Sequence, residues 1–170
     1  MPNWCTNTLQ IKGQIKDLDD MVNKLDEFEK PSGWGPALLE VFVPIGKWDY
    51  DKALKAWGTK WDVEYHVLSG IETEDGQMIL TLGFDSAWGP PIEGILTWSK
   101  SYPEAMFRIA WSELGCAQWG VSIIQDGETE RSEGGEIPDF SSLSSLTEIE
   151  YDNDKQYAFV EAVMQSLTFV

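Results

Sequence analysis

The sequence predicts an α+β protein with a ferredoxin-like sandwich, in which helices cover one face of an antiparallel sheet. Several segments alternate apolar with polar residues, as half-buried strands do, and others repeat apolar residues at helical spacing. Setting residues 31–60 aside as an insertion, the order is strand, helix, strand, strand, helix, strand, the βαββαβ pattern. A chain of 170 residues that is 42% hydrophobic can bury one substantial core.

We therefore expect a ferredoxin-like domain over residues 1–125, carrying the insertion and an extra strand. Residues 126–170 are expected to form an acidic loop and a C-terminal helix docked on the domain.

The first strand is expected near the N-terminus, where one face carries Cys5, Asn7, Leu9 and Ile11. An inward-facing Asn7 would need backbone partners. The helix that follows repeats apolar residues at helical spacing up to residue 28 and ends at the Pro-Ser-Gly of residues 31–33. Within the insertion we expect a short buried extended segment over residues 38–44, and then a short helix capped by Asp49.

A central hairpin organises the rest of the prediction. Its strands run from Trp61 to Leu68 and from Gln77 to Asp85, joined by a polar turn. Matching the apolar faces requires partner numbers with an odd sum, near 145, which pairs Trp61 with Phe84 and places Lys60 near Asp85. A sum of 147 would satisfy the faces equally well.

Downstream, prolines at 90–91 predict the start of a second helix that ends at Tyr102-Pro103. Alternation predicts strands over residues 105–113 and 118–125. Residues 126–154 hold ten carboxylates and one base, Arg131, which indicates a loop. Apolar residues at helical spacing then predict a C-terminal helix: Tyr157, Val160, Met164 and Leu167.

Four motifs in this order resemble a family of small phage- and plasmid-borne proteins with a ferredoxin-like domain and no assigned activity. They are Met1-Pro2-Asn3-Trp4-Cys5-x-Asn7, Trp57-Gly58-Thr59-Lys60-Trp61-Asp62, Phe84-Asp85-Ser86-Ala87-Trp88-Gly89-Pro90-Pro91 and Tyr102-Pro103. The resemblance covers roughly residues 1–122. It implies a fold and a mobile-element context, and no particular reaction.

The net charge narrows the possible partners. Twelve basic and 29 acidic residues give a formal charge of −17, which favours basic partners and disfavours direct binding of nucleic acid or anionic membranes. No segment reads as a membrane span or a leader peptide, so we expect a cytoplasmic protein in a host cell. Cys5 and Cys116 form no disulfide framework, and a reduced buried pair is expected.

The candidate sites are an aromatic group and a set of carboxylates. Trp4, Trp57, Trp61 and Trp88, with Lys60 as an anion partner, could form a pocket for a planar ligand or could simply close the core. Asp62, Glu64 and Asp85 could hold Mg²⁺ beside His66, the one histidine, or could be a hydrated strand edge with a Lys60–Asp85 ion pair. Neither the cysteines nor His66 have the spacing of a zinc site, and we expect no metal or cofactor.

Three functions follow as hypotheses. The first is a non-enzymatic, anti-defence phage protein whose acidic surface mimics nucleic acid and binds a basic host nucleic-acid-binding or defence protein. Its acidic candidates include Glu128, Glu130, Glu133 and Glu136. The second is a binder of a nucleotide or another small anionic ligand, which would use the aromatic group. The third is a metal-dependent phosphohydrolase that would use Asp62, Glu64 and Asp85.

Overall fold

The computed structural model describes residues 3–28 and 37–137, together with residues 158, 162 and 169. The elements follow in order: β1 (Trp4–Gln14), α1 (Ile15–Glu27), α2 (Leu39–Phe42), α3 (Tyr50–Trp57), β2 (Tyr65–Glu72), β3 (Gln77–Ala87), α4 (Ile92–Ser99), β4 (Met106–Glu113), β5 (Gln118–Gln125) and β6 (Glu128–Glu136). No helix among these residues is long and apolar enough to span a membrane.

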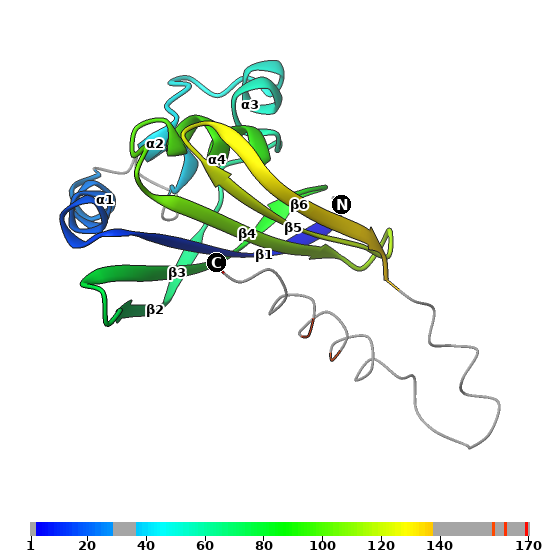
Figure 1. The fold of residues 1–170 in the computed structure, drawn as a ribbon. Coiled ribbons are helices and arrows are strands. Elements are labelled where there is room, and N and C mark those ends of the chain that lie inside the picture. The colour runs from blue at the N-terminus through cyan, green and yellow to red at the C-terminus, as the bar shows by residue number, and fades with distance from the viewer. Residues whose placement is uncertain (1–2, 29–36, 138–157, 159–161, 163–168, 170) are drawn as a thin grey trace, which may run out of the picture.

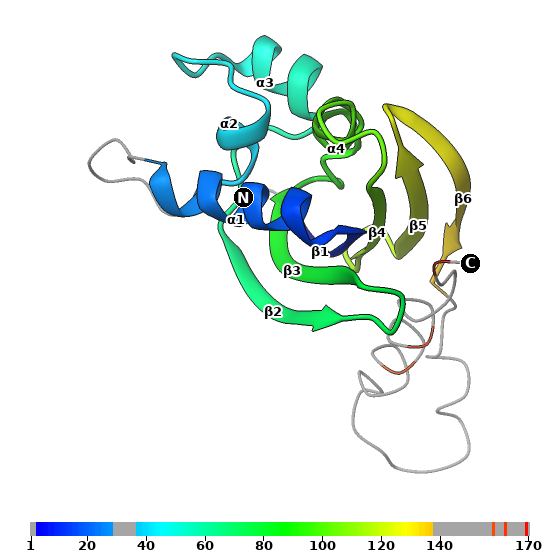
Figure 2. The same cartoon turned by 60° about the vertical axis from the view of Figure 1, so that its left-hand side comes forward.

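The strands form one antiparallel sheet in the order β2-β3-β1-β4-β5-β6. The first four strands of that order, with α1 and α4, make up the βαββαβ unit, so the predicted ferredoxin-like fold is confirmed. Helices α1 to α4 gather on one side of the sheet (Figures 1 and 2). β5 is the expected extra strand.

The core lies between the sheet and these helices. Its largest members are completely or almost completely buried and come from the helices and the central strands: Trp57, Trp98, Phe107, Leu9, Ile11, Leu18 and Met21. Trp98 stacks on Phe42 with ring centroids 3.8 Å apart and meets Phe107 edge-on at 5.3 Å. The aromatic rings therefore join the insertion to the helix–sheet core.

The hairpin forms, but the predicted register is wrong. β2 begins at Tyr65, so Trp61 lies before the strand, and Tyr65 rather than Trp61 pairs with Phe84. A bulge between Val67 and Ser69 then shifts the pairing by one residue. Partner numbers sum to 149 before the bulge (65 and 84) and to 150 after it (69 and 81), so neither 145 nor 147 holds. The turn lies later in the chain than the prediction assumed, and the bulge rules out any single sum.

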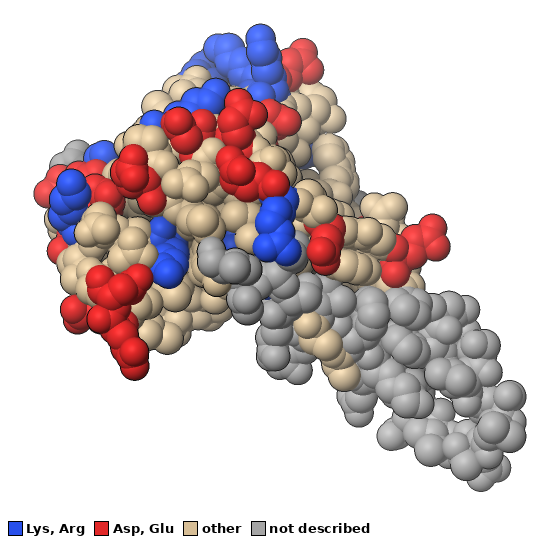
Figure 3. Space-filling view, viewed as in Figure 1, with Lys and Arg blue, Asp and Glu red and all other residues tan. Residues whose placement is uncertain are grey.

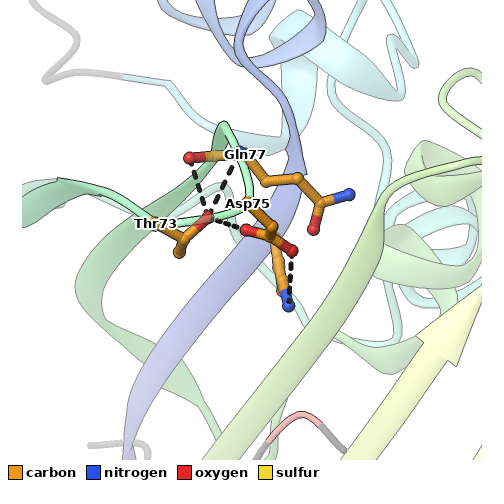
Figure 4. A network of polar contacts seen from close by, with 4 residues as sticks. Thr73, Asp75 and Gln77 are labelled. Carbon is orange, nitrogen blue, oxygen red and sulfur yellow. Dashed lines mark hydrogen bonds and ion pairs between the residues drawn. The ribbon is translucent and has the colours of Figure 1, made fainter.

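The turn of this hairpin lies closer to β3 than expected. Gly76 has a left-handed φ of 75°, and the single hydroxyl of Thr73 lies within hydrogen-bond distance of both the Asp75 carboxylate and the Gln77 carbonyl (Figure 4). Lys12 on neighbouring β1 forms an ion pair with Asp75 at 3.9 Å. These contacts place the reversal at residues 73–76 and let β2 extend to Glu72.

Two segments differ in type from the expectation. Residues 39–42, expected to be extended, form α2, because Asp62 supplies acceptors for the backbone N–H groups at its start. Residues 128–136, expected in the acidic loop, form β6. Asp126 and Gly127 have φ values of 47° and 78°, so this Asp-Gly pair makes the tight hairpin turn that such pairs favour.

The sheet thus continues to Glu136 instead of ending at residue 125. The predicted C-terminal helix at 157–167 falls almost entirely outside the described residues.

Candidate functional site

Three of the sequence motifs are fastened together at one end of β1 and β3. Trp88 N donates to Asn3 O at 2.9 Å, and Thr59 Oγ donates to Ala87 O at 2.9 Å. The chain before β2 and the chain after β3 are therefore both tied to the same corner of the sheet.

Asn7 is the buried centre of this corner. It is 1% exposed, and its Nδ2 lies 2.7 Å from Cys5 O, 2.9 Å from Ser86 Oγ and 3.3 Å from Phe84 O. Ser86 in turn donates to Gly89 O at 2.7 Å. The expectation that an inward Asn7 has backbone partners is confirmed, and these bonds fix the loop that carries Trp88.

This corner presents an exposed aromatic patch, defined here as Trp4, Tyr50, Trp61 and Trp88 around Lys60. The rings of Trp4 and Trp61 lie 6.2 Å apart, and Tyr50 meets Trp88 edge-on at 6.5 Å. Their exposed fractions run from 36% for Trp61 to 55% for Trp4. Burial of large aromatic side chains is favourable, so a group of them that stays exposed is unusual. The patch is therefore a candidate contact surface.

Lys60 is held by the aromatic rings. Its Nζ lies 4.3 Å from the ring centroid of Trp61 and 5.2 Å from that of Trp88, within cation–π range. The Lys60–Asp85 ion pair, which was part of one of the two alternatives for the carboxylates, is not among the ion pairs of the described residues. The prediction that Trp4, Lys60, Trp61 and Trp88 come together agrees with the structure.

Trp57 does not belong to the patch. It is 1% exposed, and its Nε1 donates to Val43 O at 2.8 Å, so it closes the core beneath the insertion. Tyr50, which none of the four sequence motifs contains, lies beside Trp88 instead. Trp48, 40% exposed, lies next to the patch and donates from Nε1 to Lys60 O at 3.0 Å.

Asp62 has a structural role. Its carboxylate accepts from Leu39 N at 2.7 Å, Glu40 N at 2.9 Å and Val63 N at 2.7 Å. Burial raises the pKa of this carboxyl, and the three backbone hydrogen bonds act against that rise. Asp62 therefore caps the start of α2 although it lies more than 20 residues further along the chain, and it does not line the groove that Glu64 and Asp85 share.

Glu64 and Asp85 line a sheet groove of about 400 Å³ on β1, β2 and β3. His66, Thr6 and Thr8 share this sheet groove with them. Within the described part of the chain, no cluster of three or more acidic, histidine or cysteine side chains could hold a metal ion. The grouping of Asp62 with Glu64 and Asp85 as metal ligands is therefore not found.

The acidic edge is β6. All nine of its residues are exposed, and among the described residues β6 is the last strand of the sheet beyond β5. It carries four of the predicted partner-binding residues, Glu128, Glu130, Glu133 and Glu136, against Arg131. Figure 3 shows acidic side chains scattered over the visible surface, with one group of basic side chains at the top of the view, near α3, and other basic side chains elsewhere.

An edge groove of about 360 Å³ lies between the start of α4 and β6. Pro90, Ile92 and Trp111 line it together with strand residues such as Ser122 and Ser132. A Cβ at position 120 would come within 2.7 Å of the Trp111 indole, so Gly120 is what allows that ring to lie across the strand. The edge groove thus offers hydroxyl groups and one aromatic wall beside the acidic strand.

The two cysteines lie in different environments, so the expected buried pair is not found. Burial raises the pKa of the Cys5 thiol to about 12. Cys116 is exposed at the β4–β5 turn, and the neighbouring Glu113 carboxylate raises its pKa through a hydrogen bond and its charge. Neither thiol is an activated nucleophile, because both environments favour the protonated form.

The element order and the sheet topology define a ferredoxin-like α+β protein. A family model described as the ferredoxin-like domain in Api92-like protein matches residues 56–156. The chain therefore belongs to the Api92-like family.

A crystal structure of protein api92 from Yersinia pseudotuberculosis is similar, with a TM-score of 0.55 and 10% sequence identity. The match covers 81% of this chain and 99% of that one. At this identity the likeness concerns the fold alone. No curated protein matches the chain.

Proposed function

We propose that this chain is a non-enzymatic interaction protein whose acidic sheet edge binds a basic segment of a partner protein. The observation that carries the proposal is β6, a nine-residue strand that is the outermost one beyond β5 in the part of the chain that the structure describes, is exposed throughout and holds four carboxylates. An edge strand offers backbone N–H and C=O groups to an added strand, and its side chains select what is added. Glutamates on that edge select lysine and arginine.

The edge groove supports the same mode of binding. A segment lying along β6 can place side chains against Pro90, Ile92 and Trp111, while its basic residues face the glutamates. Aromatic anchors surrounded by polar groups are typical of protein interfaces. With the groove, the choice of partner depends on the shape of the bound segment as well as on its charge.

The net charge of −17 extends this attraction over the whole molecule and speeds encounter with a basic partner. Basic surfaces of this kind belong to proteins that bind nucleic acid. We propose that the partner is a nucleic-acid-binding or defence protein of a bacterial host, and that the chain imitates phosphate charge on behalf of a phage or plasmid.

The test compares two variants of equal charge. In the edge variant, Glu128, Glu130, Glu133 and Glu136 are changed to Gln. In the control variant, four exposed carboxylates elsewhere are neutralised by Asp19→Asn, Asp26→Asn, Glu72→Gln and Glu74→Gln. Each adds four to the formal charge, from −17 to −13. Both are used with the wild type to capture proteins from a bacterial lysate at low and at raised salt, with quantitative mass spectrometry.

The proposal predicts a basic protein that the wild type and the control variant retain and that the edge variant loses. Retention should fall as salt rises, because screening weakens attraction between exposed charges. Equal retention by both variants would contradict the assignment of binding to β6, and capture that persists at raised salt would contradict an electrostatic interaction.

A further inference from the structure

We propose that the aromatic patch and the adjoining sheet groove form a second, separate site that binds a nucleotide. This inference does not depend on the acidic edge. It rests on four features of the described residues: an ammonium held between indoles, open stacking surfaces, a polar groove continuous with them, and a strained backbone that holds the patch.

The first feature is the environment of Lys60. Its ammonium faces Trp61 and Trp88 and forms no ion pair with a carboxylate among the described residues. In a chain with 29 acidic residues, a lysine held this way keeps its charge available to an incoming anion. Residues 47–60 also carry four lysines against two aspartates, a locally basic stretch in an acidic chain. A phosphate is therefore favoured at this corner.

The second feature is the open stacking surface. Trp4 is 55% and Trp88 49% exposed, so each indole leaves much of its surface to solvent. Any of the nucleic-acid bases can stack on such rings, because each base has a planar aromatic face. A cation beside the rings limits the choice to planar molecules that carry negative charge, which is the chemistry of a nucleotide.

The third feature is the continuity of the patch with the sheet groove. Trp4, Thr6 and Thr8 alternate along β1 and lie on one face, and the two threonines line the groove, so Trp4 stands on the same face of the sheet two residues before the groove. Glu64, His66 and Asp85 line that groove. Carboxylates in this position can accept hydrogen bonds from ribose hydroxyls or base amino groups. The groove volume of about 400 Å³ lies within the range of small-ligand sites.

The fourth feature is backbone strain. Trp88 has a left-handed φ of 70°, which is unfavourable for a bulky residue. The hydrogen bonds from Trp88 N to Asn3 O and from Ser86 Oγ to Gly89 O hold it there. Strain of this kind persists where the surroundings enforce it and is common in ligand sites.

The experiment is a calorimetric titration of the full-length chain with nucleoside 5′-monophosphates, the matching nucleosides and a short single-stranded oligonucleotide. The variants are Lys60→Met, Trp61→Ala and Trp61→Phe, with Lys16→Met as a control because Lys16 is an exposed lysine on α1. Far-UV circular dichroism of each variant establishes that it is folded before binding is compared.

We expect at least one monophosphate to bind the wild type. Lys60→Met should weaken that binding about tenfold, because a charge-assisted contact is lost, and should leave nucleoside binding unchanged. Trp61→Ala should weaken both ligands roughly tenfold, and Trp61→Phe should restore most of the loss because it keeps an aromatic face. Lys16→Met should change neither.

Three results would overturn the proposal: no heat of binding with any monophosphate, an equal loss in Lys16→Met and Lys60→Met, or binding of the oligonucleotide alone. The glutamine variant of β6 should bind the monophosphate as the wild type does. The two proposals therefore fail independently: loss of the protein partner would leave nucleotide binding intact, and the reverse also holds.

Discussion

Replacing Asn7 with Ala tests whether the buried corner holds the motifs together. The change removes an Nδ2 group that reaches Cys5 O, Phe84 O and Ser86 Oγ at 2.7, 3.3 and 2.9 Å. A neutral hydrogen bond contributes about 1 kcal/mol net, and a buried acceptor left without its donor costs about 1–3 kcal/mol. Since Asn7 is 1% exposed, water cannot readily replace the amide. The expected loss in unfolding free energy is about 2–4 kcal/mol.

Urea unfolding followed by circular dichroism measures this loss. For a chain of this length the same loss lowers the Tm by roughly 5–15 °C. The control is Thr6→Ala on the same strand, where an exposed side chain is removed and the expected cost is below about 1 kcal/mol. Equal losses in the two variants would refute the idea that Asn7 fastens this corner. Hydrogen exchange at the Trp88 amide should also accelerate in Asn7→Ala alone, because its loop loses an anchor.

Three further outcomes follow from the structure. Asp62→Ala should lower the unfolding free energy by about 1–3 kcal/mol in urea titrations, because two N–H groups of α2 and that of Val63 lose their acceptor. Ala117→Gly should raise it by roughly 0.5–1 kcal/mol, since φ is 51° there and only glycine adopts that conformation freely. Iodoacetamide should alkylate Cys116 and spare Cys5, with a rate that keeps rising above the pH at which an ordinary thiol levels off, because the pKa of Cys116 is raised. Glu113→Gln should move that rate profile to lower pH, because it removes the negative charge beside Cys116. Mass spectrometry measures the extent of alkylation at both cysteines.

The fold was predictable from the sequence because side-chain periodicity reports which face of an element is buried. Asn7 and Leu9 alternate with polar neighbours on β1, and the order of such segments was enough to predict the βαββαβ unit. Register was not predictable, because the long polar linker did not show that the turn lies after Glu72, and because the bulge after Val67 adds a residue that shifts the pairing again.

β6 illustrates the opposite case. The strand is exposed on both faces, so its sequence shows no alternation of apolar and polar residues. Its acidic composition therefore indicated a loop. The Asp126-Gly127 pair was the available sign, since it is the preferred two-residue hairpin turn. The sequence signal for this strand therefore lay in the turn before it and not in the pattern of its own side chains.

The candidate sites were predictable only in part. The motifs correctly placed Trp4, Lys60 and Trp61 together, because chain ends that flank paired strands meet at one corner. The motifs could not separate Trp57 from this group, because the presence of a tryptophan in the sequence does not show whether its side chain is buried in the core or exposed on the surface. Asp62 was misassigned for a related reason: a carboxylate that caps a distant helix resembles a ligand in sequence.

The most direct test of the account is hydrogen exchange on the complex with the basic protein that the wild type captures. Addition of a strand to the sheet edge predicts slowed exchange at the backbone amides of β6, residues 128–136, with β2 at the opposite edge unchanged. Slowed exchange in β2 with β6 unaffected would contradict the assignment of partner binding to the acidic edge.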